Sequence, residues 1–476
     1  MKQILSMPLP FFLTCIAIAF IMARAWKARR QAWGLPACAV LGTVTVWYVV
    51  DVFYNNYEIY QFAIGPASLT SAWWQVLWFV IAFGLFVKPI CQALNGPLPE
   101  RCSYALACLE SDLLRQTEMQ RRIDLFAGPL LIAWILLMII AVIQVKGNFV
   151  GLFAPYLGFR ADPWVRGQIG GGFSAVISLA AYFQIFLTAA FGVVAAVALN
   201  PKTRNIALTV CFLALPYFIF DRTRNAILAT TLPGILTFVF FRLRSNKWIK
   251  LGFLIAAFIA INAWFTFVMA SRGAGVGVSR SFASAEIEQA ETLDLEVRHL
   301  GLNMFEELAW IDRFLTTGRY QVNWGQRYFA ELVNPIPRGL WKNKPLIGLD
   351  YAVARGQAVR GAKGEVTATI STGMIGQGVV NFGRFLGPLA AAILMCLWVA
   401  LLVRQDLKGN DPARLILYGC GLILTFNLGR DITLLVLYPF LFGLLGYWYW
   451  ETYIRKRGTS TSDPRPTVSD DAKSPY

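Results

Sequence analysis

LFAGPLLIAWILLMIIAVIQV, residues 125–145, is a continuous apolar run without a single charged side chain. The hydrocarbon core of a bilayer is about 30 Å thick, so about 20 apolar residues in an α-helix are enough to cross it. Inside a bilayer, one isolated segment can satisfy all its backbone hydrogen bonds only as a helix. This run therefore predicts a membrane-spanning helix.

Similar apolar runs recur along almost the whole chain of 476 residues. Only 15% of the residues are charged, well below the roughly 25% that is usual for soluble domains. The sequence predicts an all-α, polytopic helical membrane protein with about 11 transmembrane helices and one large helical extracytoplasmic loop. The predicted spans are residues 7–23, 35–54, 73–90, 125–145, 169–199, 206–220, 226–241, 249–270, 384–403, 415–428 and 432–450.

The net charge of +16 could indicate a nucleic-acid partner, so its distribution along the chain matters. With the N-terminus outside and the C-terminus cytoplasmic, the cytoplasmic segments hold 23 Lys and Arg against 11 Asp and Glu. The short outside segments hold 7 against 5, and the long segment 271–384 holds 13 against 11. Such a surplus follows the positive-inside rule, which reports orientation in the membrane. We therefore expect no nucleic-acid partner.

Four parts of the chain follow from this topology. Residues 1–270 form a bundle of spans 1 to 8 with a cytoplasmic segment at 91–124, and residues 271–383 form the extracytoplasmic loop region. Residues 384–453 hold spans 9 to 11. The tail 454–476 is poor in aliphatic residues and rich in Ser, Pro and Asp, a composition typical of disorder.

The long outside segment shows helical patterns of its own. Residues 284–315 predict one helix over Leu293, Val297 and Leu300 and a second over Phe305, Leu308, Ile311 and Leu315. GQRYFAELV, residues 325–333, predicts a further short helix. A connection of this length without structure is uncommon in compact proteins. We therefore expect this segment to fold over the outer mouth of the bundle.

Metal and cofactor chemistry find no support in the sequence. All eight cysteines fall in predicted spans or cytoplasmic segments, so we expect no disulfide on the outer face. The chain has one histidine, His299, and no CxxC pair, which is too few ligands for a zinc site. We expect neither a metal nor a cofactor.

Two predicted spans, 206–220 and 415–428, are short for a bilayer and end in charged corners on the outer side. The first runs into Arg222 and Arg224, and the second runs into Arg430 and Asp431. Charged groups below the membrane surface are costly and usually functional. Snorkelling of single arginines to lipid phosphates, or Arg–Asp pairing within each corner, would also explain them.

A third basic stretch is NPIPRGLWKNKP, residues 334–345, which contains three prolines and three cations. Proline restricts the backbone, so Arg338, Lys342 and Lys344 are held on a stiff ribbon with Trp341 between them. A guanidinium can bind two phosphate oxygens at once, and an ammonium adds a point charge. These cations and the aromatic ring fit a sugar diphosphate, although a loop lying on anionic lipid headgroups would have the same composition.

The ribbon carries a resemblance to a known family. Pro337, Arg338, Trp341, Lys344 and Pro345 form P-R-x-x-W-x-x-K-P, and NFGRFLG follows at 381–387 at the head of a span. With the upstream arginine corner, the region 206–403 resembles the Wzy-type membrane polymerases of O-antigen and related oligosaccharide repeat units. Family members often carry an acid where this chain has Asn343 and Gln377. The resemblance therefore supports no acid–base role at these two positions.

This resemblance implies a glycosyltransferase at the outer face of a bacterial inner membrane. Its substrates would be glycan repeat units linked to undecaprenyl diphosphate, with membrane lipid around it, no cofactor, and a flippase and a chain-length regulator as possible partners. Preorganised cations would stabilise the departing diphosphate. The expected catalytic residues are Arg222, Arg224, Arg338, Lys344, Arg430 and Asp431, the expected substrate-binding residues are Lys342, Trp341 and Asn381, and the candidate bases are Asp350 and Glu365, with Asp431 also within this set.

Two other functions share part of this pattern. A ligase that transfers finished glycan from the same carrier to lipid A core would need the same outside arginines and long loop. A flippase or another lipid-glycan transporter would be built of helices as well, but the sequence shows no repeat between its halves. Transport also leaves the long outside segment unexplained. We therefore expect a polymerase rather than either alternative.

Overall fold

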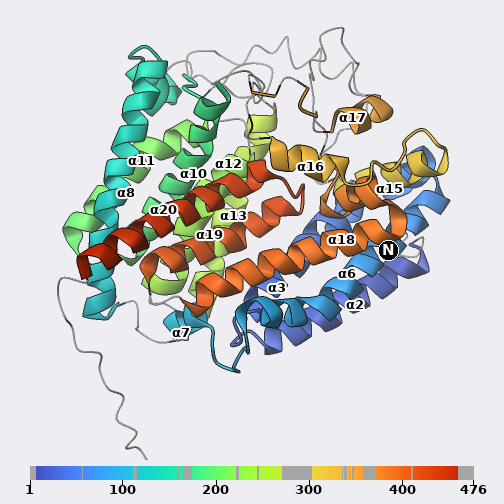
Figure 1. Cartoon of the computed structure of the whole chain (residues 1–476), viewed down its shortest axis with the longest axis horizontal. Helices are drawn as coiled ribbons and strands as arrows, with labels where there is room; N and C mark the ends of the chain where they lie inside the picture. The colour runs from blue at the N-terminus through green and yellow to red at the C-terminus, as the bar shows by residue number, and fades with distance from the viewer. Residues whose placement is uncertain are drawn as a thin grey trace, which may run out of the picture.

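The computed structural model describes residues 7–55, 57–110, 115–157, 161–164, 174–220, 224–243, 246–270, 303–334, 336, 340–341, 343–345, 348–356, 371–408 and 411–458. Within these ranges the fold is all-helical, as the sequence predicts (Figure 1). The predicted helix over 284–300 and residues 459–476 of the predicted disordered tail lie outside these ranges. The first residues of that predicted tail, 454–458, belong to the last helix.

Helices occupy all eleven positions of the predicted spans. In the first half of the chain these are α2 (Leu9–Lys27), α3 (Gly34–Val44) continued by the π-helical turn η1 (Thr45–Val50) and α4 (Asp51–Tyr54), α6 (Pro66–Asn95), α8 (Thr117–Gln144), α10 (Ser174–Val197) and α11 (Pro201–Ile219). In the second half they are α12 (Arg224–Thr237) with the π-helical turn η4 (Phe238–Arg242), α13 (Lys247–Ala270), α18 (Met374–Leu407), α19 (Pro412–Leu428) and α20 (Leu434–Gly458). The connecting helices are α5 (Tyr57–Ala63), α7 (Tyr104–Glu110), α9 (Phe149–Phe153), the 3₁₀ turn η3 (Pro155–Leu157), α15 (Met304–Thr316), α16 (Gln326–Val333) and α17 (Leu349–Arg355).

Seven of the described helices are long and apolar enough to cross a membrane, and the protein is therefore a helical membrane protein. Two further apolar helices, Ala226–Arg242 and Pro412–Leu428, are shorter. The total of eleven spans stays a prediction. The helix at 206–220 is longer than its apolar run, because α11 includes Lys202 and Arg204 in its first turn and reaches 19 residues. α19, with 17 residues, remains short, as predicted.

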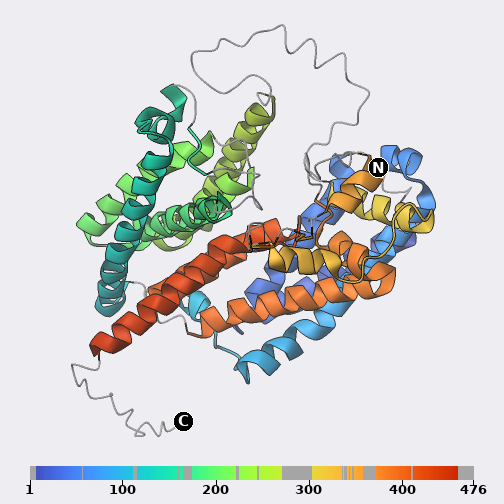
Figure 2. The same cartoon turned by 45° about the horizontal axis from the view of Figure 1, so that its top comes forward.

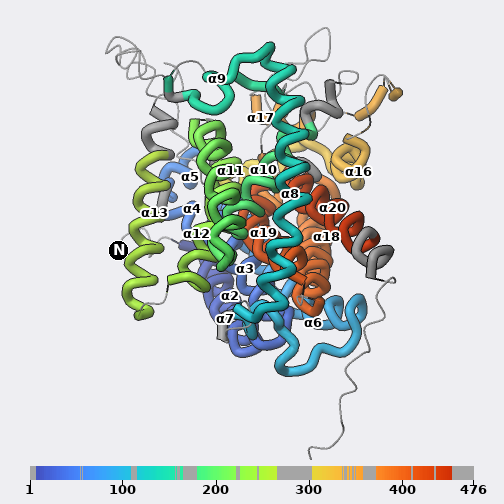
Figure 3. Tube along the Cα trace, turned by 90° about the vertical axis from the view of Figure 1, so that its left-hand side faces the viewer, coloured from blue at the N-terminus to red at the C-terminus, as the bar shows by residue number. Residues whose placement is uncertain are grey.

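The two ends of the bundle differ in what they carry. Figures 1 and 3 show α16 and α17 at one end, together with α9, and α7 at the opposite end. α16 and α17 come from the long segment predicted to lie outside, and α7 comes from the segment 91–124 predicted to be cytoplasmic. The side of the membrane that each end faces stays a prediction.

The spans form two groups that meet at α19 and α20. Figure 2 shows α8 to α13, in teal and green, apart from the blue and orange group of α2 to α6 and α15 to α18, with α20 in red between them. Tyr438 of α20 packs against Tyr182 of α10 at 5.3 Å between ring centroids. Two residues later, Phe440 packs against Trp398 of α18 at 4.9 Å. α20 therefore ties the two groups together.

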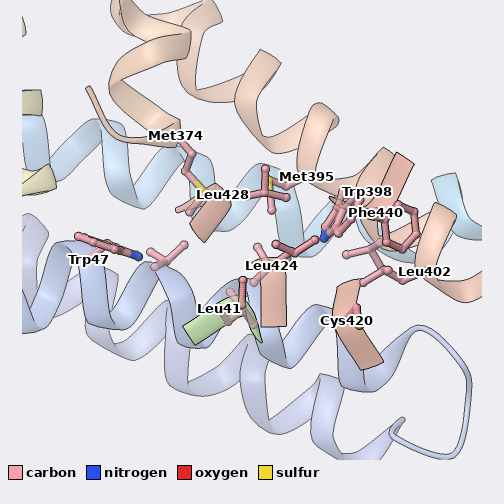
Figure 4. Packing of buried hydrophobic residues seen from close by; sticks show 14 of the residues in the cluster. Leu41, Trp47, Met374, Met395, Trp398, Leu402, Cys420, Leu424, Leu428 and Phe440 are labelled. Carbon is pink, nitrogen blue, oxygen red and sulfur yellow. The ribbon is translucent and has the colours of Figure 1, made fainter. Parts of the chain in front are cut away.

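The core at this junction is apolar and closely filled. Figure 4 shows Leu41 and Trp47 from the α3 segment, Met395 and Trp398 from α18, Leu424 from α19 and Phe440 from α20 packed together. Within the group of α8 to α13, α10 and α12 approach so closely that a Cβ at Gly234 would lie 3.1 Å from the Gly192 backbone. Small residues at such crossings are typical of membrane helices, because dispersion contacts drive their association.

α18 starts ten residues before the predicted span at 384–403 and is bent near its start. The helix begins at Met374, and Gly383 interrupts it with φ 78° and ψ −176°, a conformation that a side chain would strain. The part of α18 before Gly383 folds back onto the part after it. The two parts are so close that a Cβ at Gly387 would lie 2.5 Å from Val379. The bend buries the side chains of Gln377 and Asn381 at the end of the bundle that carries α16.

Candidate functional site

The segment that continues α3, with Tyr48 and Asp51, holds the starts of α15 and α18. Asp51 accepts a hydrogen bond at 2.8 Å from the backbone N–H of Phe305, in the first turn of α15. Tyr48 accepts one at 3.0 Å from the N–H of Ile375, in the first turn of α18. The first backbone N–H groups of a helix have no partner within it, so these contacts satisfy donors that would otherwise be buried unpaired.

Short loops next to these helix starts form the floor of the candidate site. Gln377 donates to the carbonyl of Ile432 at 3.1 Å and accepts from the Ile432 N–H at 2.8 Å. Asp431 accepts from the backbone N–H of Thr372 at 3.1 Å and from its hydroxyl at 3.2 Å. The chain between α19 and α20 is therefore fixed to the start of α18.

α16 buries charged side chains and exposes apolar ones, the reverse of a surface helix in a soluble protein. Arg327 and Glu331 point inward and are only 6% and 4% exposed, whereas Phe329 and Leu332 on the other face are 49% and 67% exposed. Residues four apart share a helix face, so the two charged side chains are neighbours. A helix with charges inside and apolar side chains outside suits a membrane environment around a polar interior.

The buried face of α16 meets the loop between α19 and α20. Arg327 Nη2 lies 3.7 Å from Asp431 Oδ1. Among the described residues, Arg327 Nε and Nη1, the Tyr328 hydroxyl and Glu331 Oε2 are buried without a hydrogen-bond partner. The hydroxyl of Tyr438, at the start of α20, is in the same state. Buried polar groups are normally paired, so this cluster of unsatisfied atoms requires an explanation.

The electrostatics of this cluster favour a protonated Glu331. Burial, together with the charge of Asp431, raises the pKa of the Glu331 carboxyl to about 8, and the charge of Arg327 opposes this increase. One guanidinium therefore faces two carboxyl groups in a poorly solvated place. Residues whose pKa is moved towards neutral pH by burial and a specific charged neighbour are candidates for functional sites.

A second ionic cluster lies in α15 and α17, and its opposite charges pair with each other. Arg355 donates to Glu306 at 3.1 Å and lies 3.5 Å from Glu307, and its guanidinium lies over the Trp310 ring at 4.5 Å. The Tyr351 hydroxyl donates to Glu307. Because the Arg355 charge is matched by carboxylates of the same cluster, we interpret it as a structural clamp that holds α17 on α15.

The sequence-predicted residues fall into four groups in the structure. Arg430 is exposed and donates to the Ser371 hydroxyl at 2.7 Å, and its neighbour Asp431 belongs to the buried cluster. Asp350 is exposed in the first turn of α17, and Arg224 is the first residue of α12. The residues outside the described ranges are Arg222, Arg338, Lys342 and Glu365.

Three other predicted residues have visible structural partners. Lys344 is 4% exposed, and its ammonium donates to the carbonyls of Asn334 at 2.8 Å and Ile336 at 2.9 Å. Trp341 packs edge-on against Phe329 of α16 at 6.2 Å. Asn381 is fully buried, donates to the Gln377 carbonyl at 2.7 Å and accepts from the Tyr328 N–H at 3.3 Å. The ribbon is therefore attached to the end of α16, and α16 to α18.

Metal ligation is not visible in the described part of the chain. No group of three or more His, Cys, Asp or Glu side chains there could hold a metal ion.

Comparison of the chain with protein-family models, with curated proteins and with solved structures found no match. The geometry of the site must therefore carry the functional argument.

Sequence reasoning missed Arg327 and Glu331, although it predicted the short helix that holds them. The signal was present in QRYFAELV, where a charged pair with helical spacing alternates with Phe329 and Leu332. In a soluble protein this pattern indicates that the charged face is solvated. In a membrane protein either face can be the inner one, and only the packing of α16 on α18 decides it.

Proposed function

We propose that this protein polymerises oligosaccharide repeat units carried on undecaprenyl diphosphate, at the extracytoplasmic face of a bacterial inner membrane. One observation carries this proposal: at one end of a membrane bundle, α16 places Arg327 and Glu331 inside and Phe329 and Leu332 outside. The substrate has the same division, because its prenyl tail is apolar and its diphosphate head is charged.

The chemistry of this transfer requires what the site provides. As the glycosidic bond to the carrier breaks, negative charge develops on the leaving diphosphate. Guanidinium groups stabilise such charge most strongly where water is excluded and where they are already in place. Arg327 has unpaired nitrogen donors among the described residues, and Arg430 lies exposed beside the same loop. The site therefore offers one buried and one exposed guanidinium to the diphosphate.

Further support comes from the sequence ribbon. The ammonium of Lys344 is held by the backbone carbonyls of Asn334 and Ile336. In the proposal, Arg338 and Lys342 of the same stretch contact the substrate, and Lys344 has a structural role. Trp341, next to Phe329, supplies an aromatic surface for a sugar ring or for the first units of the prenyl chain.

The test is the surface glycan of a deletion strain complemented with variants. Loss of this protein should leave single repeat units on the lipid core while long chains disappear, and the carrier-linked pool should hold unpolymerised units. Arg327→Gln should give the same pattern with normal amounts of protein in the membrane. Long chains that accumulate on the carrier would instead indicate ligation, and absence of single units would indicate transport.

A matched control is available in the second ionic cluster. Arg355 is also a largely buried arginine of the same region, with a side chain 14% exposed, but its partners are Glu306 and Glu307. Arg355→Gln should reduce the amount of folded protein in the membrane, and the glycan chain length per folded molecule should stay normal. If Arg327→Gln behaves in the same way as Arg355→Gln, the proposed role of Arg327 in substrate binding is wrong.

A further inference from the structure

Glu331 is the one acid of the buried cluster whose position the proposed function leaves unexplained. Its side chain is 4% exposed, and its Oε2 has no hydrogen-bond partner among the described residues. It faces Arg327 on its own helix, Asp431 from the loop between α19 and α20, and Tyr438 from α20. A buried carboxyl without a partner is costly, so a fold would not keep it for stability.

Asp431, by contrast, is held in place through its Oδ1. This oxygen accepts two hydrogen bonds from Thr372 and lies 3.7 Å from Arg327. These contacts fix the Asp431 side chain between the start of α18 and the Arg327 guanidinium. Its charge also makes ionisation of the neighbouring Glu331 harder. Two carboxyl groups in one site with different surroundings are the usual basis for a division of roles between them.

We propose that Glu331 is the general base that deprotonates the acceptor sugar hydroxyl, and that Asp431 is a positioning residue that orients Arg327 towards the leaving diphosphate. This inference rests on the proposed polymerase function. It differs from the sequence-based expectation, in which Asp350, Glu365 and Asp431 were the candidate bases.

The proposed step balances in atoms and charge. The acceptor hydroxyl loses its proton to the Glu331 carboxylate, and its oxygen forms a bond to the anomeric carbon of the growing chain. The bond between that carbon and the diphosphate oxygen breaks, and its electron pair leaves with undecaprenyl diphosphate. Arg327 faces the additional negative charge. The proton then passes from Glu331 to water or to the diphosphate, which restores the base.

The acid–base properties of Glu331 fit this task. A general base works best when its pKa lies near the working pH, and burial raises the pKa of Glu331 to about 8. The nearby titratable groups act in opposite directions, since Asp431 raises this pKa and Arg327 lowers it. A diphosphate that binds Arg327 would weaken the opposing effect and make Glu331 a stronger base once the substrate is in place.

The test uses full-length protein in proteoliposomes with lipid-linked repeat units extracted from the deletion strain. Glu331→Gln should slow chain extension by about 10²-fold or more, the usual loss for a removed general base. Binding of undecaprenyl diphosphate to the same variant should change less than about twofold, because Arg327 remains. The rate of the unchanged protein should rise with pH through the pKa of Glu331, and that dependence should be absent in Glu331→Gln.

Two further variants keep the test decisive. Glu331→Asp retains a carboxyl and should recover part of the rate together with a pH dependence, which a purely structural role would not produce. Glu118→Gln changes an exposed glutamate that pairs, within the described ranges, with Arg121 and Arg122, and this variant should have no effect. If the unchanged protein extends chains and Glu331→Gln extends them equally fast, the base assignment is wrong and the proposed function stands. If the unchanged protein extends no chains, the proposed function itself is wrong.

Discussion

Arg327 Nη2 lies 3.7 Å from Asp431 Oδ1, and this contact joins α16 to the loop between α19 and α20. In the sequence, α17, α18 and α19 lie between these two residues. The loop is in turn fixed by Thr372 and Gln377 at the start of α18. The contact therefore closes a ring of three segments around one buried guanidinium.

The first prediction concerns the energetics of this ion pair. Asp431→Ala removes the negative partner and should destabilise the protein by about 3–5 kcal/mol, because it leaves a buried charge uncompensated. The double variant Arg327→Met, Asp431→Leu removes both charges and should be clearly more stable than Asp431→Ala alone. Unfolding of the purified variants in detergent, followed by tryptophan fluorescence, measures both. A double variant that is the least stable of all would contradict this interpretation.

A second prediction is a decrease of stability with rising pH that originates at Glu331. The carboxyl has a pKa of about 8 in the folded protein, against about 4.3 in an unfolded chain. The folded state therefore binds more protons between these values, and the free energy of unfolding falls as pH rises from about 4.3 to 8. Glu331→Gln should flatten this slope, and unfolding midpoints measured from pH 5 to pH 9 would show it. An unchanged slope would place the titrating group elsewhere.

The bend in α18 gives a third prediction. A methyl group at Gly387 would lie 2.5 Å from the backbone of Val379, so Gly387→Ala should cost at least about 1–3 kcal/mol and reduce the folded yield. Gly419→Ala is a matched control in α19, because nothing lies within 4 Å of the new methyl group. It should be neutral or stabilising by up to about 1 kcal/mol. Equal yields of both variants would mean that the close approach does not exist.

The fourth prediction tests the orientation of the bundle. Leu340, 83% exposed beside α16, and Glu100, exposed near α7, should lie on opposite sides of the membrane. Single cysteines at these positions, in a chain whose eight native cysteines are replaced, can be labelled in intact cells with an impermeant maleimide. Leu340→Cys should react from outside, and Glu100→Cys should react only after lysis. The reverse pattern would remove the site from the compartment where lipid-linked units are polymerised.

Much of the helical layout was predictable, because span position depends on local apolar composition. The second helix of the long segment and the short helix at 325–333 were also predicted from spacing, and α15 and α16 confirm them. Lengths were less predictable. α11 extends through Lys202 and Arg204, since the helix continues past the apolar core into polar surroundings.

The site was harder to predict because it depends on contacts between distant segments. Nothing near Asp431 in sequence indicates that Arg327 is its partner, and nothing near Lys344 shows that its ammonium is bound to two carbonyls. The contact of α16 with α18, through the Tyr328 N–H and Asn381, is likewise made between residues far apart in sequence. A run of charged and apolar residues at helical spacing is the same on paper whichever face points inward.

The central claim is bond formation between lipid-linked repeat units, and purified protein can test it directly. Proteoliposomes containing this protein and repeat units extracted from its own deletion strain should produce a ladder of longer lipid-linked chains. One undecaprenyl diphosphate should be released for every glycosidic bond formed, and Arg327→Gln should abolish both products. Movement of the lipid-linked units between leaflets without any longer chain or released diphosphate would contradict the account.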